Sequence, residues 1–220
     1  MPAHASLRKY SGSRVLDCGV RSADLSNVNG VILLSMPAGI EKRLFTADEY
    51  QAMGMAGILS EDDRVELIDG EILVMTPISA AHAAAVNRAT RALVRAAGDA
   101  AIVSPQNPVR LNLFNEPQPD LVLFRPRDDF YRTTHPLISD VLLVIEIAHS
   151  SLRYDRDVKA ALYARHAVVE YWLVHLESGT VTRYTSPEDG SYRETAVHAR
   201  GERVAPRALP DCVIGVDDLI

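Results

Sequence analysis

The segment Val141–Ala148 constrains the fold more than any other part of this chain, because it is apolar at every position except Glu146. A run of this kind predicts a central β-strand that is covered on both faces. A carboxylate inside such a strand must be paired, protonated or bound to a metal ion, because an isolated buried charge is costly. Taken alone, Glu146 would favour the simplest of these solutions, which is a salt bridge to a nearby arginine.

A second buried strand is predicted at Asp120–Phe124, between Pro119 and Pro126. Its first residue, Asp120, is a carboxylate that would lie at the end of a strand beside the one that holds Glu146. Two carboxylates at the ends of neighbouring strands can hold one hard cation such as Mg²⁺, which prefers oxygen ligands and keeps several waters. The pair therefore favours a metal site over a simple salt bridge.

The helix predicted at Asp155–Ala167 supplies a lysine to the same region, with Asp155 as its N-cap. Asp155, Lys159 and Tyr163 recur every four residues and so share one helix face. The simpler alternative is a surface pair between Asp155 and Lys159, worth about 0.2 to 0.5 kcal/mol. Because the link from the preceding strand is short, the helix must fold back on the sheet, and we expect Lys159 to point at Glu146.

Two further polar residues are candidates for the same site. Glu66 lies in a β-hairpin predicted from the tight-turn sequence Asp69-Gly70. His82 lies at the start of a helix predicted from Ser79 to Ala97. As site residues, Glu66 would add a carboxylate and His82 would contact a phosphate or water. The alternatives carry equal weight: a strand carboxylate in solvent, and a histidine satisfied by the backbone.

The overall composition indicates a soluble globular protein. Hydrophobic residues make up 47% of the 220-residue chain, and no apolar run approaches the roughly 20 residues that span a bilayer. Cys18 and Cys212 lie far apart without metal or redox spacing, which favours the cytoplasm. Residues 1–40 show little periodicity and predict a poorly ordered N-terminal extension, whereas residues 41–220 predict one domain.

The net charge of −6 weighs against indiscriminate binding to nucleic acid, which usually requires an excess of lysine and arginine. A local basic stripe is nevertheless present on the helix predicted at Ser79–Ala97, where Arg88, Arg91 and Arg95 share one face. For this stripe, a solvated helix face is favoured over DNA contact. A second basic cluster near the candidate site comprises Arg153, Arg156, Lys159 and Arg165.

The remaining periodicity completes an α/β pattern. The other predicted elements are a capped helix from Thr46 to about Met53, hairpin strands at Val65–Ile68 and Glu71–Met75, strands at Ala101–Ser104, Val109–Leu113 and Val169–His175, and a terminal hairpin of Thr180–Thr185 and Tyr192–His198.

Several of these motifs together resemble the Uma family, bacterial proteins described as restriction endonucleases of the PD-(D/E)xK superfamily. The resemblance covers roughly residues 44 to 215. It rests on Leu143–Lys159 with its continuation to Val174, on Arg64–Ile72, on His82 and on Pro119-Asp120.

The resemblance implies a restriction-endonuclease-like core, a mixed β-sheet flanked by helices with additional β-hairpins. It further implies that Asp120 and Glu146 bind Mg²⁺ or Mn²⁺, that Lys159 is catalytic, and that DNA is the substrate. The chain departs from the superfamily at Ala148, because that position, two residues after the strand glutamate, usually holds a lysine. The helix would have to supply the lysine, at Lys159.

Three interpretations follow. The first is a metal-dependent DNA endonuclease, for which a homodimer would suit the cutting of both strands of a duplex. The second is a catalytically inactive nuclease-fold module that binds nucleic acid or a protein partner, since fold does not fix function. The third, and the least favoured, makes the acidic residues structural salt bridges in an oligomer core.

Overall fold

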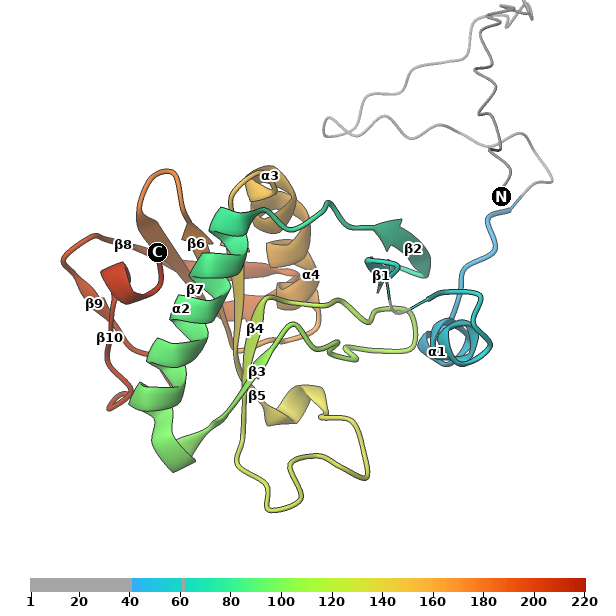
Figure 1. The fold of residues 1–220 in the computed structure, drawn as a ribbon, viewed down its shortest axis with the longest axis horizontal. Coiled ribbons are helices and arrows are strands. Elements are labelled where there is room, and N and C mark those ends of the chain that lie inside the picture. The colour runs from blue at the N-terminus through green and yellow to red at the C-terminus, as the bar shows by residue number, and fades with distance from the viewer. Residues whose placement is uncertain (1–40, 61) are drawn as a thin grey trace, which may run out of the picture. The chain divides into compact units, whose positions relative to one another are not determined.

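A computed structural model describes residues 41–60 and 62–220 of the chain (Figure 1). Its centre is a six-stranded sheet in the order β3-β4-β5-β6-β7-β8. All neighbouring strands are antiparallel except β5 and β6, which are parallel, so the predicted mixed sheet is confirmed. The strands are β3 (Ile102–Pro105), β4 (Leu121–Phe124), β5 (Val141–Ala148), β6 (Glu170–His175), β7 (Thr180–Glu188) and β8 (Ser191–Ala199).

Helices and two small two-stranded sheets surround this core. Among the described residues, β1 pairs with β2 across the predicted Asp69-Gly70 turn, whose two residues have positive φ angles of 49° and 76°. The flanking elements are α1 (Ala47–Met55), β1 (Val65–Ile68), β2 (Glu71–Val74), α2 (Ala80–Ala97), α3 (Leu152–Tyr154), α4 (Ala160–Arg165), β9 (Arg203–Val204) and β10 (Ile214–Gly215).

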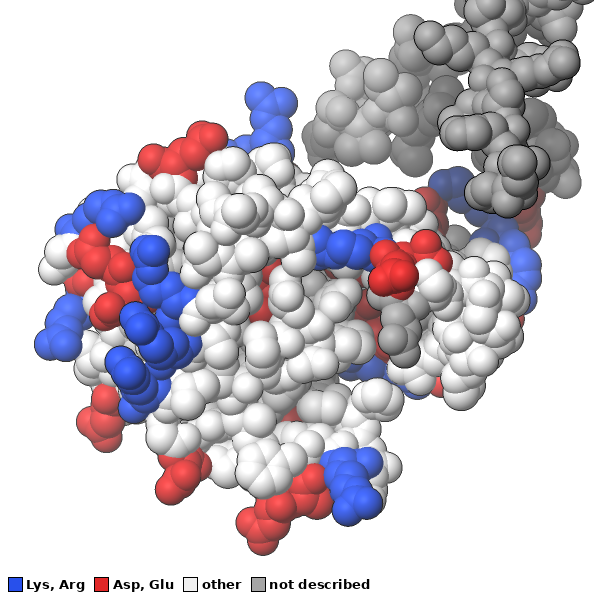
Figure 2. Space-filling model, viewed as in Figure 1, with Lys and Arg blue, Asp and Glu red and all other residues white. Residues whose placement is uncertain are grey.

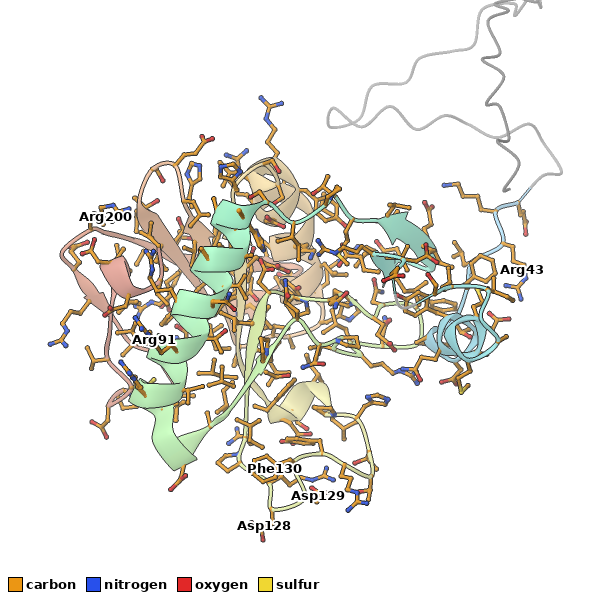
Figure 3. The ribbon with its side chains drawn as sticks, viewed as in Figure 1. Arg43, Arg91, Asp128, Asp129, Phe130 and Arg200 are labelled. Carbon is orange, nitrogen blue, oxygen red and sulfur yellow. The ribbon has the colours of Figure 1, made fainter. Side chains whose placement is uncertain are left out.

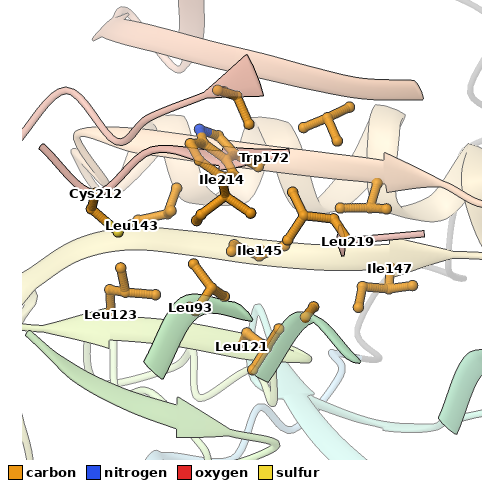
Figure 4. Packing of buried hydrophobic residues seen from close by; sticks show 14 of the residues in the cluster. Leu93, Leu121, Leu123, Leu143, Ile145, Ile147, Trp172, Cys212, Ile214 and Leu219 are labelled. Carbon is orange, nitrogen blue, oxygen red and sulfur yellow. The ribbon is translucent and has the colours of Figure 1, made fainter. Parts of the chain in front are cut away.

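Strand β5 is buried along its whole length, as its sequence predicts. Leu143, Ile145 and Ile147 pack on one face of the sheet against α2 and the C-terminal segment (Figure 4). Val144 and Ala148 point to the other face, where α4 packs. Successive strand side chains alternate between faces, so Glu146 belongs to the α4 side. The fold therefore determines which elements can reach this carboxylate.

Helix α2 lies across the sheet (Figure 1). Its buried residues, which include Val86, Ala89 and Leu93, belong to the same hydrophobic cluster as Leu143 and Ile145 of β5. The Ser79 hydroxyl caps its first turn by accepting a hydrogen bond from the backbone N–H of His82 at 3.2 Å. Gly98 ends the helix with φ 51°, a conformation that suits glycine. Both ends of the predicted helix are confirmed, and the cap fixes His82 at the end nearest the candidate site.

The strand predicted at Val109–Leu113 is wrong. The backbone N–H of Leu111 instead bonds to the carbonyl of Asn115 at 2.9 Å, and that of Val109 bonds to the carbonyl of Pro117 at 2.9 Å. The segment thus closes a local turn, and no ladder with the central sheet forms. Val109 and Leu111 are still buried, in the cluster that contains Ile68 of β1. The apolar pattern therefore predicts the burial of this segment correctly but not its secondary structure.

The extension predicted for residues 1–40 lies outside the described residues. Within the described residues, no helix has the length and apolar character that crossing a membrane requires.

We expect Leu93→Ala to lower the free energy of unfolding by about 2 to 5 kcal/mol, because it leaves a cavity between α2 and the sheet. Leu93 is fully buried, whereas the adjacent Val94 is 52% exposed. The matched change Val94→Ala should therefore alter stability by less than about 0.5 kcal/mol. Equal losses in chemical denaturation would contradict the packing described.

Candidate active site

The register of the sheet places Asp120 beside Glu146. Leu121 of β4 is opposite Ile145 of β5, and continuing this antiparallel register by one residue puts Asp120 opposite Glu146. The backbone N–H of Asp120 donates to Glu146 Oε2 at 3.3 Å. The backbone N–H of Ile147 donates to Asp120 Oδ2 at 2.8 Å. Both carboxylates are thus fixed by the backbone of neighbouring strands, as the sequence predicts.

Lys159 lies between two buried carboxylates. Its Nζ is 2.9 Å from Glu146 Oε1 and 3.1 Å from Glu66 Oε2. The predicted approach of Lys159 to Glu146 is therefore present. The alternative of a surface pair between Lys159 and Asp155 is wrong, because each of the two residues is only 4% exposed. Glu66 is 2% exposed, so its interpretation as a solvent carboxylate is wrong as well.

Tyrosine hydroxyls complete the hydrogen bonds of these carboxylates. Tyr163 donates to Glu146 Oε1 at 2.8 Å, in agreement with its expected place near the site. Tyr154 donates to Glu66 Oε1 at 3.1 Å, and the backbone N–H of Gln118 donates to Glu66 Oε2 at 3.3 Å. Tyr154 and Gln118 are site residues that the sequence did not predict.

A wide turn in the helix explains why Tyr154 was missed. Residues Asp155–Lys159 form a π-helical turn between α3 and α4, and such turns are frequent at functional sites. Tyr154 and Lys159 are five residues apart, which aligns them in a π-helix but not in an α-helix. The hydroxyl of Tyr171 donates to the backbone carbonyl of Asp155 at 3.1 Å and so satisfies a group within the irregular turn.

The predicted N-cap role of Asp155 is wrong. The helix begins at Leu152, one turn earlier than predicted, so Asp155 lies inside it. Its carboxylate accepts a hydrogen bond from the hydroxyl of Ser151, and it is buried on the side of the cleft. Burial raises the pKa of Asp155.

His82 connects α2 to the site. Its Nε2 is 2.8 Å from Asp120 Oδ1, so the ring is not satisfied by the backbone alone. The hydrogen bond to Asp120 raises the pKa of His82 above its ordinary value, against the lowering effect of burial.

The site holds more carboxylates than cations. Burial raises the pKa of Glu146 to about 8, although Lys159 acts in the opposite direction. Burial also lowers the pKa of Lys159, but Glu146 and Glu66 outweigh it, so the pKa of the ammonium is raised. The cluster of carboxylates around Lys159 therefore favours binding of a proton or of another cation. Its acidic members are Glu66, Asp120, Glu146 and Asp155.

These residues line a cleft of about 510 Å³. One wall is formed by β2 and the segment that leads to α2, including Leu73, Met75 and Ile78. Other lining residues come from the loop after β5 and from the start of the following helix, including His149 and Tyr154.

A sequence model described as "Uma2: Putative restriction endonuclease" matches residues 47–217. The chain belongs to the Uma2 family. Its fold is shared by the crystal structure of a putative nuclease belonging to DUF820 from Anabaena variabilis ATCC 29413, with a TM-score of 0.61 and 19% sequence identity. That match covers 80% of this chain and 97% of the other. No protein of curated function matches.

The donor set of this Uma2 protein fits the divalent cation that the resemblance implies. Among residues 41–60 and 62–220, no group of three or more His, Cys, Asp or Glu side chains could hold a metal ion. Mg²⁺ does not need such a group, because it is commonly bound through one or two carboxylates and completes its shell with waters and substrate phosphates. Asp120 and Glu146, which both line the cleft, are the two carboxylates that would hold such a cation.

We expect Lys159→Met to lower the free energy of unfolding by about 3 to 5 kcal/mol, because it leaves Glu66 and Glu146 buried without their cation. Adding Glu66→Gln and Glu146→Gln to this variant should restore much of the loss, since both carboxylates then become neutral. Chemical denaturation at pH 9, above the Glu146 pKa of about 8, measures both changes. A Lys159→Met protein as stable as the wild type would contradict the buried ion pairs.

We expect the pKa of His82, measured by NMR, to lie above 6.5 and to fall below it in Asp120→Asn, where burial acts without the carboxylate. Because the folded-state pKa is raised, the pair adds stability that is fully present below the unfolded pKa. That stability is lost as pH rises through the folded pKa. The same pKa in both proteins would contradict the His82–Asp120 contact.

Proposed function

We propose that this Uma2-family protein is a metal-dependent endonuclease that hydrolyses phosphodiester bonds in DNA. The observation that carries the proposal is the meeting of Asp120, Glu146 and Lys159 at the base of one cleft. Neighbouring strands hold the carboxylates, and the following helix returns the lysine to them. A purely structural ion pair would not require a cleft at this position.

Asp120 and Glu146 would hold Mg²⁺ or Mn²⁺. When bound, such a cation lowers the pKa of a water molecule and polarises the scissile phosphate. The raised pKa of Glu146 supports this assignment. It means that the negative charge of the site is not fully balanced by Lys159, and a metal cation would supply the positive charge that a proton on Glu146 otherwise provides.

The protein's own groups would act in separate ways. The Lys159 ammonium would stabilise negative charge that develops on the phosphate. Glu66 and Tyr163 would act as positioning residues, because they hold Lys159 and Glu146 in place. His82 would orient the Asp120 carboxylate through its 2.8 Å contact.

A second candidate is a nuclease-fold module that binds nucleic acid or a protein partner without cutting. Two observations favour it. The position usually occupied by lysine in the superfamily is Ala148, and the ammonium of Lys159 is already engaged by both Glu66 and Glu146.

We expect Mn²⁺ to bind the wild-type protein in calorimetry and not to bind Asp120→Asn/Glu146→Gln. Binding should strengthen as pH rises toward the pKa of Glu146, about 8, because the cation competes with its proton. The control Asp128→Asn/Glu177→Gln makes the same chemical changes at exposed residues and should bind as the wild type does. Equal binding by both double variants would contradict the proposed metal site.

Cleavage separates the two candidate functions. With Mg²⁺ or Mn²⁺, the wild type and the Asp128→Asn/Glu177→Gln control should cut DNA, and Asp120→Asn/Glu146→Gln should not. A wild type that binds metal and duplex DNA but leaves a broad panel of DNA substrates intact would favour the non-cutting module.

A further inference from the structure

We propose that the exposed face of α2 is a contact surface for the phosphate backbone of the DNA that enters the cleft. The choice of DNA as the ligand rests on the proposed function. The surface itself is inferred from residues that are not part of the active site. Arg88, Arg91 and Arg95 lie on this face and are exposed. The helix has no acidic residue in any of its 18 positions, so nothing along it neutralises these charges.

The three arginines are also unpaired within the described part of the chain, where no hydrogen bond or ion pair joins them to another residue. Some other exposed arginines are held by carboxylates, such as Arg156 by Asp157 at 2.7 Å and Arg200 by Asp217 at 3.0 Å. Basic side chains gather over α2 in Figure 2, and Figure 3 shows Arg91 projecting from this helix. The charge of the stripe is therefore available to an anion.

The stripe runs along the same helix that contributes His82 to the site. At a rise of 1.5 Å per residue, Arg88 lies about 9 Å and Arg95 about 20 Å beyond His82 along the axis. The interval from Arg88 to Arg95 is about 10 Å, which matches about three phosphates of one strand at 3.4 Å each. His82 contacts Asp120 from the first turn of α2, whereas the three arginines lie on the opposite, exposed side of the helix. The stripe therefore begins about 9 Å along the axis from His82 and leads away from the cleft.

The chemistry of the stripe matches phosphate. Arginine presents a planar fork of donors that pairs with phosphate oxygens and does not lose its charge. The protein as a whole carries a net charge of −6 and would repel a polyanion at most orientations. A local run of unpaired arginines would overcome this repulsion at one surface and so orient DNA relative to the cleft.

The test compares Arg88→Gln/Arg91→Gln/Arg95→Gln with a matched control, Arg132→Gln/Arg193→Gln/Arg207→Gln. The control removes the same charge from other exposed positions. Both sets are placed in the Asp120→Asn/Glu146→Gln protein, so that binding is measured without cleavage. The probe is a fluorescent DNA duplex of about 30 base pairs, titrated by anisotropy at several salt concentrations, with thermal melts to verify folding.

We expect the α2 variant to lose at least about tenfold in affinity near 0.1 M salt. Its slope of log affinity against log salt should be smaller by about 2 to 3, corresponding to three lost phosphate contacts. The control should change the slope by less than about 1. Equal effects of the two variants, or no binding before either change, would overturn the proposal. If binding depends on α2 while the wild-type protein leaves a broad panel of DNA substrates intact, the proposed endonuclease is refuted and the proposed contact surface stands.

Discussion

The buried contacts of Lys159 with Glu66 and Glu146 are the interaction on which the site depends. They join the β1 hairpin, the central strand and the returning helix at one point. Burying these charges has a large desolvation cost, which is offset only when each charge is paired and its remaining hydrogen bonds are made. Tyr154 and Tyr163 supply such bonds to the two glutamates. The arrangement therefore positions a lysine rigidly while retaining more negative than positive charge around it.

Solvent reaches this arrangement through the cleft. The two apolar clusters cover both faces of the sheet, so β5 has no exposed surface along its length. Asp120 lies just before β4 begins, and its side chain is still 13% exposed. The cleft thus meets the sheet where a strand ends, and α2 contributes both His82 and an unpaired basic face to its surroundings.

The sequence predicted those parts of the site that local patterns determine. The apolar run around Glu146 predicts its burial, and the short link after β5 predicts that Lys159 returns to it. The burial of Glu66 could not be predicted, because it depends on a partner 93 positions away in the chain. Tyr154 was not predicted because a π-helical turn shifts the side-chain alignment of the helix, and the interior place of Asp155 was not predicted because the helix begins one turn earlier, at Leu152. The order of the six strands was not predicted, because it depends on pairings between segments that are far apart in the chain.

The most direct test of the account is the position of Mn²⁺ in a crystal of the wild-type protein, located by its anomalous scattering. The account predicts one peak within about 2.0 to 2.6 Å of carboxylate oxygens from both Asp120 and Glu146, at the base of the cleft. A well-occupied peak elsewhere, with both carboxylates still bound only by protein groups, would contradict the central claim that this pair is the metal site.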